Sequence, residues 1–214
     1  MKKYITLILL SLLLFSCPVY AAKTTKQKIA SSVKRADIVI AGSSSVCRWK
    51  KAKTHFSPYK VANLGVGGTI VEDWQKYHSY IAKCKPKVIV IYVGNNNFKT
   101  KQDSGALVAK KSIKLLKTIS KNNPKAKVYY VSLHPNPKKW AFWKQVQICN
   151  NTVKKWCKTN KKVDFIDIRK YCLKNGKPNL NLFCDSIHFN SKGYNNVWNK
   201  IVATKVKKYL KKNN

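Results

Sequence analysis

The sequence predicts an α/β fold: a three-layer α/β/α sandwich around a mainly parallel, five-stranded sheet. Five strand-length runs rich in Val, Ile and Tyr are apolar at almost every position, as expected of strands buried on both faces. Segments of helical character separate these runs, and such alternation is typical of right-handed βαβ units. The 214 residues contain no internal repeat and no break in composition, so we expect one folded domain.

The expected strands and helices alternate along the chain. The strands are placed at residues 37–41, 60–64, 87–93, 127–133 and 163–168, and the helices at 70–82, 105–121, 140–159 and 191–210. In an open parallel sheet, ligands bind outside the carboxyl ends of the strands. The residues with distinctive chemistry all follow strands and are therefore expected at that edge: Ser44, Gly68, Asn96, His134, Asp185 and His188.

The first 21 residues have the character of a secretory signal peptide. Two lysines precede an apolar run over residues 5–15, and small residues at the end of the segment fit cleavage after Ala21. The apolar run is too short to span a bilayer. We therefore expect a mature domain of residues 22–214, without a transmembrane span, in a secreted or periplasmic location. A lipid anchor on Cys17 is the alternative, since the residues before it partly match a lipoprotein signal.

Export would place the cysteines in an oxidising compartment, where disulfides form. Six cysteines remain after Ala21, enough for as many as three bridges, but their spacing does not define the pairs. We expect first a bridge between Cys172 and Cys184, which would close the loop before Asp185. No Cys-x-x-Cys unit occurs, so we expect no structural zinc.

The chain is strongly basic, since 44 Lys and Arg against seven Asp and Glu give a net charge of +37. Such a surface would attract anionic envelope polymers, acidic polysaccharide or lipid headgroups. A general bias of the source proteome toward Lys and Asn would produce the same composition without a partner. No nucleic-acid-binding motif accompanies the charge, which argues against a specific nucleic-acid partner.

Turns of small residues follow the first two strands. The run Gly42-Ser43-Ser44-Ser45 places hydroxyls where a strand turns into a helix, and the first N–H groups of that helix can face a developing oxyanion. The second turn ends in Gly67-Gly68, where the absence of side chains lets the backbone approach a ligand. Taken alone, each turn is also an ordinary connection between a strand and a helix.

Two further motifs carry polar side chains. In Gly94-Asn95-Asn96-Asn97 a carboxamide can donate to an oxyanion, although the run also suits a simple polar turn. In Asp185-Ser186-Ile187-His188 a carboxylate precedes one of only four histidines by three residues. Such a carboxylate can fix the tautomer of the ring and stabilise the imidazolium that forms when the ring accepts a serine proton. In isolation, the same unit would read as an exposed loop histidine.

In this order, the four motifs resemble those of the SGNH (GDSL-type) hydrolase family, a lipase/acylhydrolase family named for its Ser, Gly, Asn and His. The resemblance extends over roughly residues 37–210 and implies a flavodoxin-like SGNH hydrolase fold. It further implies that Ser44 is the nucleophile, that His188 is the base and that Asp185 orients His188.

The resemblance also implies an oxyanion hole formed by the amides of Ser44 and Gly68 and the carboxamide of Asn96. Two positions depart from the usual pattern. Ser43 stands in place of the Asp of Gly-Asp-Ser, which makes this chain a Gly-Ser-Ser-Ser variant, and Asn97 replaces the Asp that usually follows the family's Asn. Among the three adjacent serines, only the alignment selects Ser44.

Three more residues are expected near a substrate. His134 lies in a segment that resembles a loop of such acylhydrolases and is a second candidate base, but no acid neighbours it, and we expect it to line the pocket. Trp140 and Trp143 are expected to contact substrate. Their spacing also suits a helix face packed against the core.

These observations predict a secreted, monomeric serine esterase that needs no metal and no organic cofactor. Its substrates would be small-molecule, glycan or lipid esters, such as O-acyl groups on envelope or extracellular polymers. The alternative is a non-catalytic polycationic protein that uses the same fold to hold anionic glycan, membrane or nucleic acid.

Overall fold

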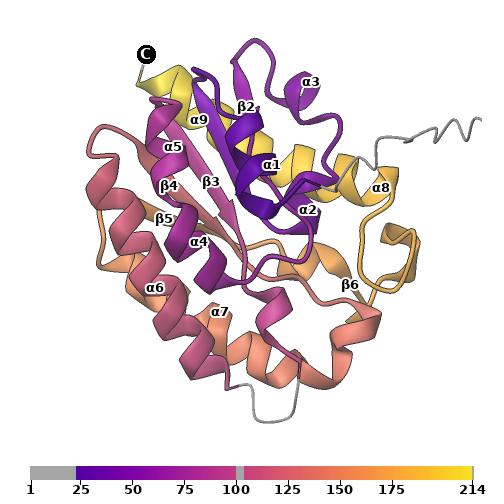
Figure 1. Cartoon of the computed structure of the whole chain (residues 1–214). Coiled ribbons are helices and arrows are strands. Elements are labelled where there is room, and N and C mark those ends of the chain that lie inside the picture. The colour runs from indigo at the N-terminus through magenta and orange to yellow at the C-terminus, as the bar shows by residue number, and fades with distance from the viewer. Residues whose placement is uncertain (1–22, 100–103, 214) are drawn as a thin grey trace, which may run out of the picture.

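The structure is a computed structural model that describes residues 23–99 and 104–213. Helices cover both faces of one five-stranded sheet (Figure 1). In the spatial order β2-β1-β3-β4-β5, every neighbouring pair of strands is parallel. The strands are β1 (Ile38–Gly42), β2 (Val61–Asn63), β3 (Val88–Tyr92), β4 (Lys127–Val131) and β5 (Val163–Ile166). The predicted α/β sandwich is confirmed, with a sheet that is wholly parallel.

The two inner strands β1 and β3 are buried at every position. Their Val and Ile side chains pack against helices on both faces, which is why neither strand alternates between apolar and polar residues. The strand order reverses after β2, since β1 pairs with β2 on one side and with β3 on the other. A ligand crevice is expected at this reversal, outside the carboxyl end of β1.

Four helices follow β2, β3 and β4 and share one face of the sheet, where α6 contacts the other three. Figure 1 shows α4 and α6 in front of the strands and α9 behind them. The right-handed connections put α2, α3, η5 and α9 on the opposite face, where α3 contacts η5. The front helices are α4 (Val71–Tyr77), α5 (Ser79–Lys83), α6 (Gly105–Asn122) and α7 (Trp143–Lys158); those behind are α2 (Ser44–Cys47), α3 (Ala52–Phe56), η5 (Tyr194–Ala203) and α9 (Thr204–Lys212).

Three predicted helices have more internal structure than expected. The helix expected over 70–82 is interrupted at His78 and forms α4 and α5. The helix expected from residue 140 begins earlier, as a 3₁₀ segment, η2 (Pro137–Phe142), with proline at its first position, where its missing N–H costs no hydrogen bond. The last helix starts with α8 (Ser191–Gly193) and widens into the π-helical η5 before α9.

Several short elements were not predicted. The largest is α1 (Thr25–Ser31), which buries Ile29 and begins with a capping box on Thr24. A two-stranded antiparallel ribbon turns at an Asn-Gly pair with positive φ at both residues, as tight hairpins require. The remaining short elements are β6 (Leu173–Lys174), β7 (Lys177–Pro178), η1 (Asn95–Asn97), η3 (Arg169–Cys172) and η4 (Leu180–Leu182).

The expected bridge between Cys172 and Cys184 is wrong, because all six cysteines in the described part of the chain are free thiols. The Cys172 thiol is buried, with Sγ 3.3 Å from the carbonyl oxygen of Ile168. The Cys184 thiol is exposed, with Sγ 3.4 Å from the carbonyl oxygen of His188. The two sulfur atoms are thus directed to different backbone carbonyls.

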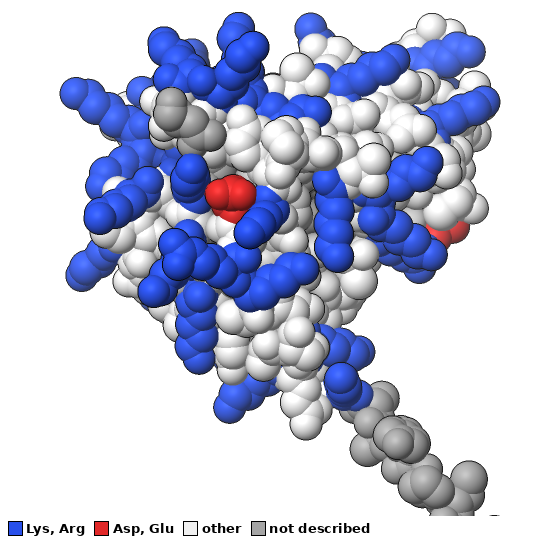
Figure 2. Space-filling view, turned by 90° about the horizontal axis from the view of Figure 1, so that it is seen from above, with Lys and Arg blue, Asp and Glu red and all other residues white. Residues whose placement is uncertain are grey.

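Positive side chains are spread over the surface rather than gathered in one patch. Figure 2 shows Lys and Arg across the whole visible face, around isolated acidic side chains. No helix within the described ranges is long and apolar enough to cross a membrane. The proposed signal peptide, residues 1–21, and Cys17 lie outside the described residues.

Candidate active site

The turn after β1 presents one serine to the surface. Gly42 has φ of +142°, and a Cβ at this position would lie 1.9 Å from the carbonyl oxygen of Tyr92, so only glycine fits. Beyond it, Ser43 is 2% and Ser45 is 4% exposed, whereas Ser44 is only partly buried. Burial therefore singles out the Ser44 hydroxyl among the three.

A continuous chain of hydrogen bonds joins this serine to the loop near the C-terminus. His188 Nε2 lies 3.0 Å from Ser44 Oγ, and His188 Nδ1 lies 2.7 Å from Asp185 Oδ2. The other carboxylate oxygen, Oδ1, accepts hydrogen bonds from the backbone N–H groups of Ile187 and His188, each at 2.7 Å. A hydroxyl is thus in direct contact with an imidazole 144 residues further along the chain, and the imidazole with a carboxylate three residues before it.

The environment of Asp185 favours its ionised form. Loss of solvent around the Asp185 carboxyl would by itself raise its pKa, but the hydrogen bonds from the His188 ring and from the two backbone N–H groups together hold it well below its usual range. The carboxylate is therefore charged throughout the neutral range. A charged acceptor at Nδ1 fixes the ring tautomer that leaves Nε2 free to accept the Ser44 proton.

The glycine and asparagine turns meet the serine at the same edge. A Cβ on Gly67 would lie 3.8 Å from Ser44 Cβ, while Gly68 has φ of +80° and borders open space. Asn96 Nδ2 donates to the carbonyl oxygen of Thr69 at 3.1 Å, which ties the third turn to the second. The backbone N–H groups of Ser44 and Gly68 have no acceptor in the described part of the chain. The second turn thus lies next to Ser44, and the third turn is tied to the second through Asn96.

Asn97, at the departure from the family pattern, links two elements. Its Oδ1 accepts from the N–H of Val71 at 3.1 Å, and its Nδ2 donates to Glu72 Oε2 at 2.7 Å. Glu72 also pairs with Lys111. Burial would raise the pKa of Glu72, but the bonds from Lys111 and Asn97 lower it overall. The carboxylate missing at residue 97 is thus supplied next to it by Glu72.

His134 lies in the aromatic core, with 1% of its surface exposed. Its ring stacks on Phe189, with centroids 4.3 Å apart, and on Tyr92 at 5.6 Å. Burial lowers the pKa of His134 to about 4, so the ring is neutral at pH 7. The predicted role of His134 in lining a substrate pocket stays a prediction. The ring packs against Phe189, the residue that follows His188.

Trp140 and Trp143 lie together near the start of α7. Their rings stack with centroids 5.8 Å apart and planes inclined by 18°, and both side chains are partly exposed. Trp143 borders a surface hollow with Asp167 and Arg169. The predicted contact of the two tryptophans with substrate stays a prediction.

Two positioning residues were missed by the sequence reasoning. Tyr194 donates its hydroxyl to the carbonyl oxygen of Ser45 at 2.9 Å, and Asn190 donates to the carbonyls of Asn181 and Phe183 at 3.0 and 3.2 Å. Tyr194 gives no local signal, since it reads as an ordinary apolar helix residue. Asn190 precedes a predicted helix start, and a helix-capping motif there was a usable signal.

No group of three or more His, Cys, Asp or Glu side chains arranged to hold a metal occurs in the described ranges. What these residues bring together is a serine, an imidazole and a carboxylate, joined by hydrogen bonds at the carboxyl edge of a parallel sheet. That is the arrangement of serine hydrolases.

The chain belongs to the GDSL-like Lipase/Acylhydrolase family, whose sequence profile matches residues 38–195. This confirms the family expected from the four motifs and supports hydrolase activity toward esters. It also agrees with the fold, since solved structures of family members share the architecture.

Similarity to individual proteins is lower. The rat platelet-activating factor acetylhydrolase IB subunit alpha1 is 29% identical over 122 residues, which are 50% of this chain and 49% of that protein. The chain therefore spans about half the length of the curated relatives it matches. A GDSL-like lipase from Bacteroides thetaiotaomicron superimposes with a TM-score of 0.69 at 17% identity, covering 84% of this chain and 90% of that one. A carbohydrate esterase family 3 structure from Talaromyces cellulolyticus gives 0.58 at 16% identity, with 82% and 96% covered.

Proposed function

We propose that the protein is a secreted serine esterase that cleaves ester bonds through Ser44, His188 and Asp185. The observation that carries the proposal is the unbroken hydrogen-bonded chain from Ser44 Oγ through His188 to Asp185. Its distances, 3.0 and 2.7 Å, are those needed for proton transfer to a general base.

In the first half of the reaction, Ser44 Oγ attacks the ester carbonyl carbon while its proton moves to His188 Nε2. The negative charge that develops on the carbonyl oxygen is met by the N–H groups of Ser44 and Gly68 and by Asn96 Nδ2. The tetrahedral intermediate then collapses, the alcohol departs with the proton from His188, and an acyl group stays on Ser44.

The second half repeats these steps with water. His188 takes a proton from water, which attacks the acyl carbonyl, and the proton returns to Ser44 Oγ as the acid leaves. Asp185 remains ionised throughout and stabilises each imidazolium that forms. The scheme uses only side chains and backbone amides of this chain.

The substrates we propose are O-acyl groups on envelope or extracellular glycans or lipids. The net charge of +37 would concentrate anionic polymers near the enzyme. The names of two similar proteins, an acetylhydrolase and a carbohydrate esterase, agree with short acyl groups on such carriers. Export, as expected of residues 1–21, would place the enzyme beside them.

The test is hydrolysis of p-nitrophenyl acetate and longer-chain esters by wild type, Ser44→Ala and Ser43→Ala. Removing the nucleophile should lower kcat by about 10³-fold or more. Ser43→Ala is the matched control, because this neighbouring hydroxyl is buried and accepts no hydrogen bond from the N–H groups that begin α2. Equal turnover by wild type and Ser44→Ala would contradict the proposal.

The second candidate is a non-catalytic polycationic binding protein on the same fold, and the observation that favours it is the charge. It would bind polyanions such as anionic glycans with steep dependence on salt and show no turnover that depends on Ser44. Binding to an immobilised polyanion across a salt series, measured beside the esterase assay, separates the two candidates.

A further inference from the structure

A cleft beside the hydrogen-bonded chain is lined by the two segments that carry it. One wall is the stretch that follows α2, from Arg48 to Lys51, and the other comes from Cys184 and from residues 189–195. The cleft has a volume of about 330 Å³. Since Ser44 lies in α2 and Asp185 follows Cys184, both walls continue directly into the residues proposed to react.

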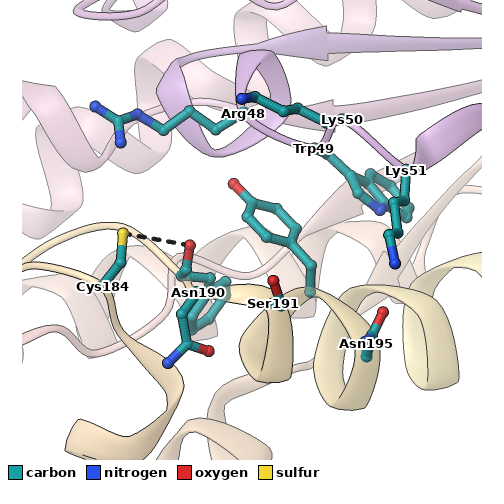
Figure 3. A pocket seen from close by; sticks show the side chains of 10 residues that line it. Arg48, Trp49, Lys50, Lys51, Cys184, Asn190, Ser191 and Asn195 are labelled. Carbon is teal, nitrogen blue, oxygen red and sulfur yellow. Dashed lines mark hydrogen bonds between the residues drawn. The ribbon is translucent and has the colours of Figure 1, made fainter.

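The cleft combines positive charge at its rim with aromatic side chains inside. Figure 3 shows Arg48, Lys50 and Lys51 above it and Asn190, Ser191 and Asn195 below; Arg48 extends over the Cys184 side, and Lys51 reaches down toward Asn195. No aspartate or glutamate lines it. Within the described ranges, no carboxylate forms an ion pair with any of the three cations.

The interior of the cleft is apolar and fixed. Trp49 is 1%, Phe189 3% and Tyr194 9% exposed, so their rings are held by the core and expose little of their surface to the cavity. The indole N–H of Trp49 is already used, because it donates to His55 Nδ1 at 2.9 Å. A ligand would therefore meet apolar walls in the cavity and unpaired cations at its mouth.

We propose that this cleft binds an anionic group, a phosphate or carboxylate, carried by the ester substrate next to its scissile bond. The three cations, which pair with no carboxylate in the described part of the chain, match such a group by charge, and the guanidinium of Arg48 can hold two of its oxygens at once. The apolar interior would take the uncharged part that links the anion to the ester. The proposal rests on the esterase function and narrows its substrates to negatively charged esters.

The turnover test compares phenyl acetate with 4-acetoxyphenyl phosphate, which adds a phosphate to the same aryl ester. The cleft variant is Arg48→Gln/Lys50→Gln/Lys51→Gln. The control variant is Lys110→Gln/Lys114→Gln/Lys117→Gln, which removes the same charge from three exposed lysines around another hollow, on α6. In the cleft variant, kcat/KM for the phosphate ester should fall about tenfold more than that for phenyl acetate. The control variant should change the two substrates equally.

A binding measurement separates this inference from the esterase proposal. In a Ser44→Ala background, calorimetry with phenyl phosphate should show binding that the cleft substitutions weaken about tenfold and the α6 substitutions leave unchanged. Equal weakening by both variants would assign the binding to overall charge and overturn the proposal, as would unchanged binding in the cleft variant. If the cleft substitutions alone weaken phenyl phosphate binding, but the protein with Ser44 intact hydrolyses neither ester, the anion site stands and the esterase proposal is refuted.

Discussion

The two halves of the candidate site are built in different ways. Ser44 lies on a turn that packs tightly against the core. Gly42 contacts the backbone of β3, and a Cβ on Gly65 would lie 2.5 Å from the backbone N of Cys47. Asn63 Nδ2 donates to the carbonyl oxygen of Val46 at 2.9 Å. The Asp185–His188 loop is exposed and held mainly by hydrogen bonds of short sequence range.

The loop nevertheless has a defined shape. Cys184 N–H donates to the carbonyl of His188 at 2.9 Å, and Phe183 and Phe189 form an isolated antiparallel bridge. Ser186 accepts from the N–H of Lys138 at 3.0 Å, which fastens the loop to η2. The difference teaches that substitutions in the serine half should change stability as well as chemistry, whereas those in the loop half should change chemistry alone.

The largest expected effect is on the loop half. Asp185→Asn should lower kcat by roughly 10²- to 10⁴-fold, because a neutral amide neither fixes the required tautomer of His188 nor stabilises its charged form. The free energy of unfolding should change by less than about 1 kcal/mol, since the side chain is exposed. Steady-state kinetics and urea unfolding measure the two quantities.

Asp164→Asn is the matched control, since the side chain of this aspartate is 42% exposed, against 45% for Asp185, and it pairs with Lys205 rather than with a residue of the site. It should leave kcat unchanged. A large loss of stability in Asp185→Asn, or turnover by this variant equal to that of wild type, would contradict the expectation that substitutions in the loop half change chemistry alone.

The next largest effect is on the stability of the serine half. Gly42→Ala should destabilise the protein by about 3 kcal/mol or more, because the new Cβ would overlap the Tyr92 carbonyl and φ there is positive. Gly176→Ala is its control: φ is also positive, +73°, but no atom lies within 4 Å of the new Cβ. That variant should lose only about 1 kcal/mol. Thermal and urea unfolding of both variants would reveal whether the close contact or the positive φ causes most of the loss of stability in Gly42→Ala.

Tyr194→Phe should have a smaller effect on the same half. It removes the hydroxyl that donates to Ser45 and leaves a buried carbonyl without this donor. We expect a loss of about 1 kcal/mol of stability and a reduction in kcat of a few fold. If kcat falls without any loss of stability, the tyrosine acts on the reaction in a way that a merely structural role does not explain.

The smallest effect concerns acid stability at a site outside both halves. Asp167 lies between Arg169, at 2.6 Å, and Lys154, at 3.1 Å. Partial burial raises the pKa of its carboxyl, but the bonds from Arg169 and Lys154 outweigh this and lower it to about 2. The ionised form therefore stabilises the fold above about pH 4 by roughly 1 kcal/mol, and this contribution is lost as the pH falls toward 2.

Asp167→Asn should consequently lower the Tm at pH 7 and flatten its decline between pH 4 and pH 2. Calorimetric scans at a series of pH values test this. An identical pH profile in wild type and variant would show that the ion pairs contribute nothing measurable.

The sheet and the convergence of the motifs were predictable because they follow from periodic burial. Continuous apolar runs such as residues 87–93 are typical of strands that are buried on both faces of a parallel sheet. Parallel strands bring the residues that follow them to one edge of the sheet. That argument placed Ser44 and His188 at the same edge, although 144 residues separate them.

Other features depend on contacts that no local pattern records. The exposure of Ser44 between two buried serines is set by the packing of its turn on Gly65 and Tyr194. The depth of His134 could not be predicted either, because the strand-end rule gives the edge on which a residue lies but not how deeply it is buried. Its ring is buried since three aromatic rings, from distant segments, pack around it.

The distribution of the free thiols has a practical consequence. Burial raises the pKa of Cys149 and Cys157 to about 12, which keeps these two sulfur atoms protonated and unreactive. In the described part of the chain only Cys47 and Cys184 are exposed, one three residues after Ser44 and the other directly before Asp185. Among the described residues, a maleimide-linked fluorophore would thus attach beside the two halves of the site. In residues 23–99 and 104–213, Cys47→Ser leaves Cys184 as the one exposed thiol, a labelling handle for following the loop during turnover.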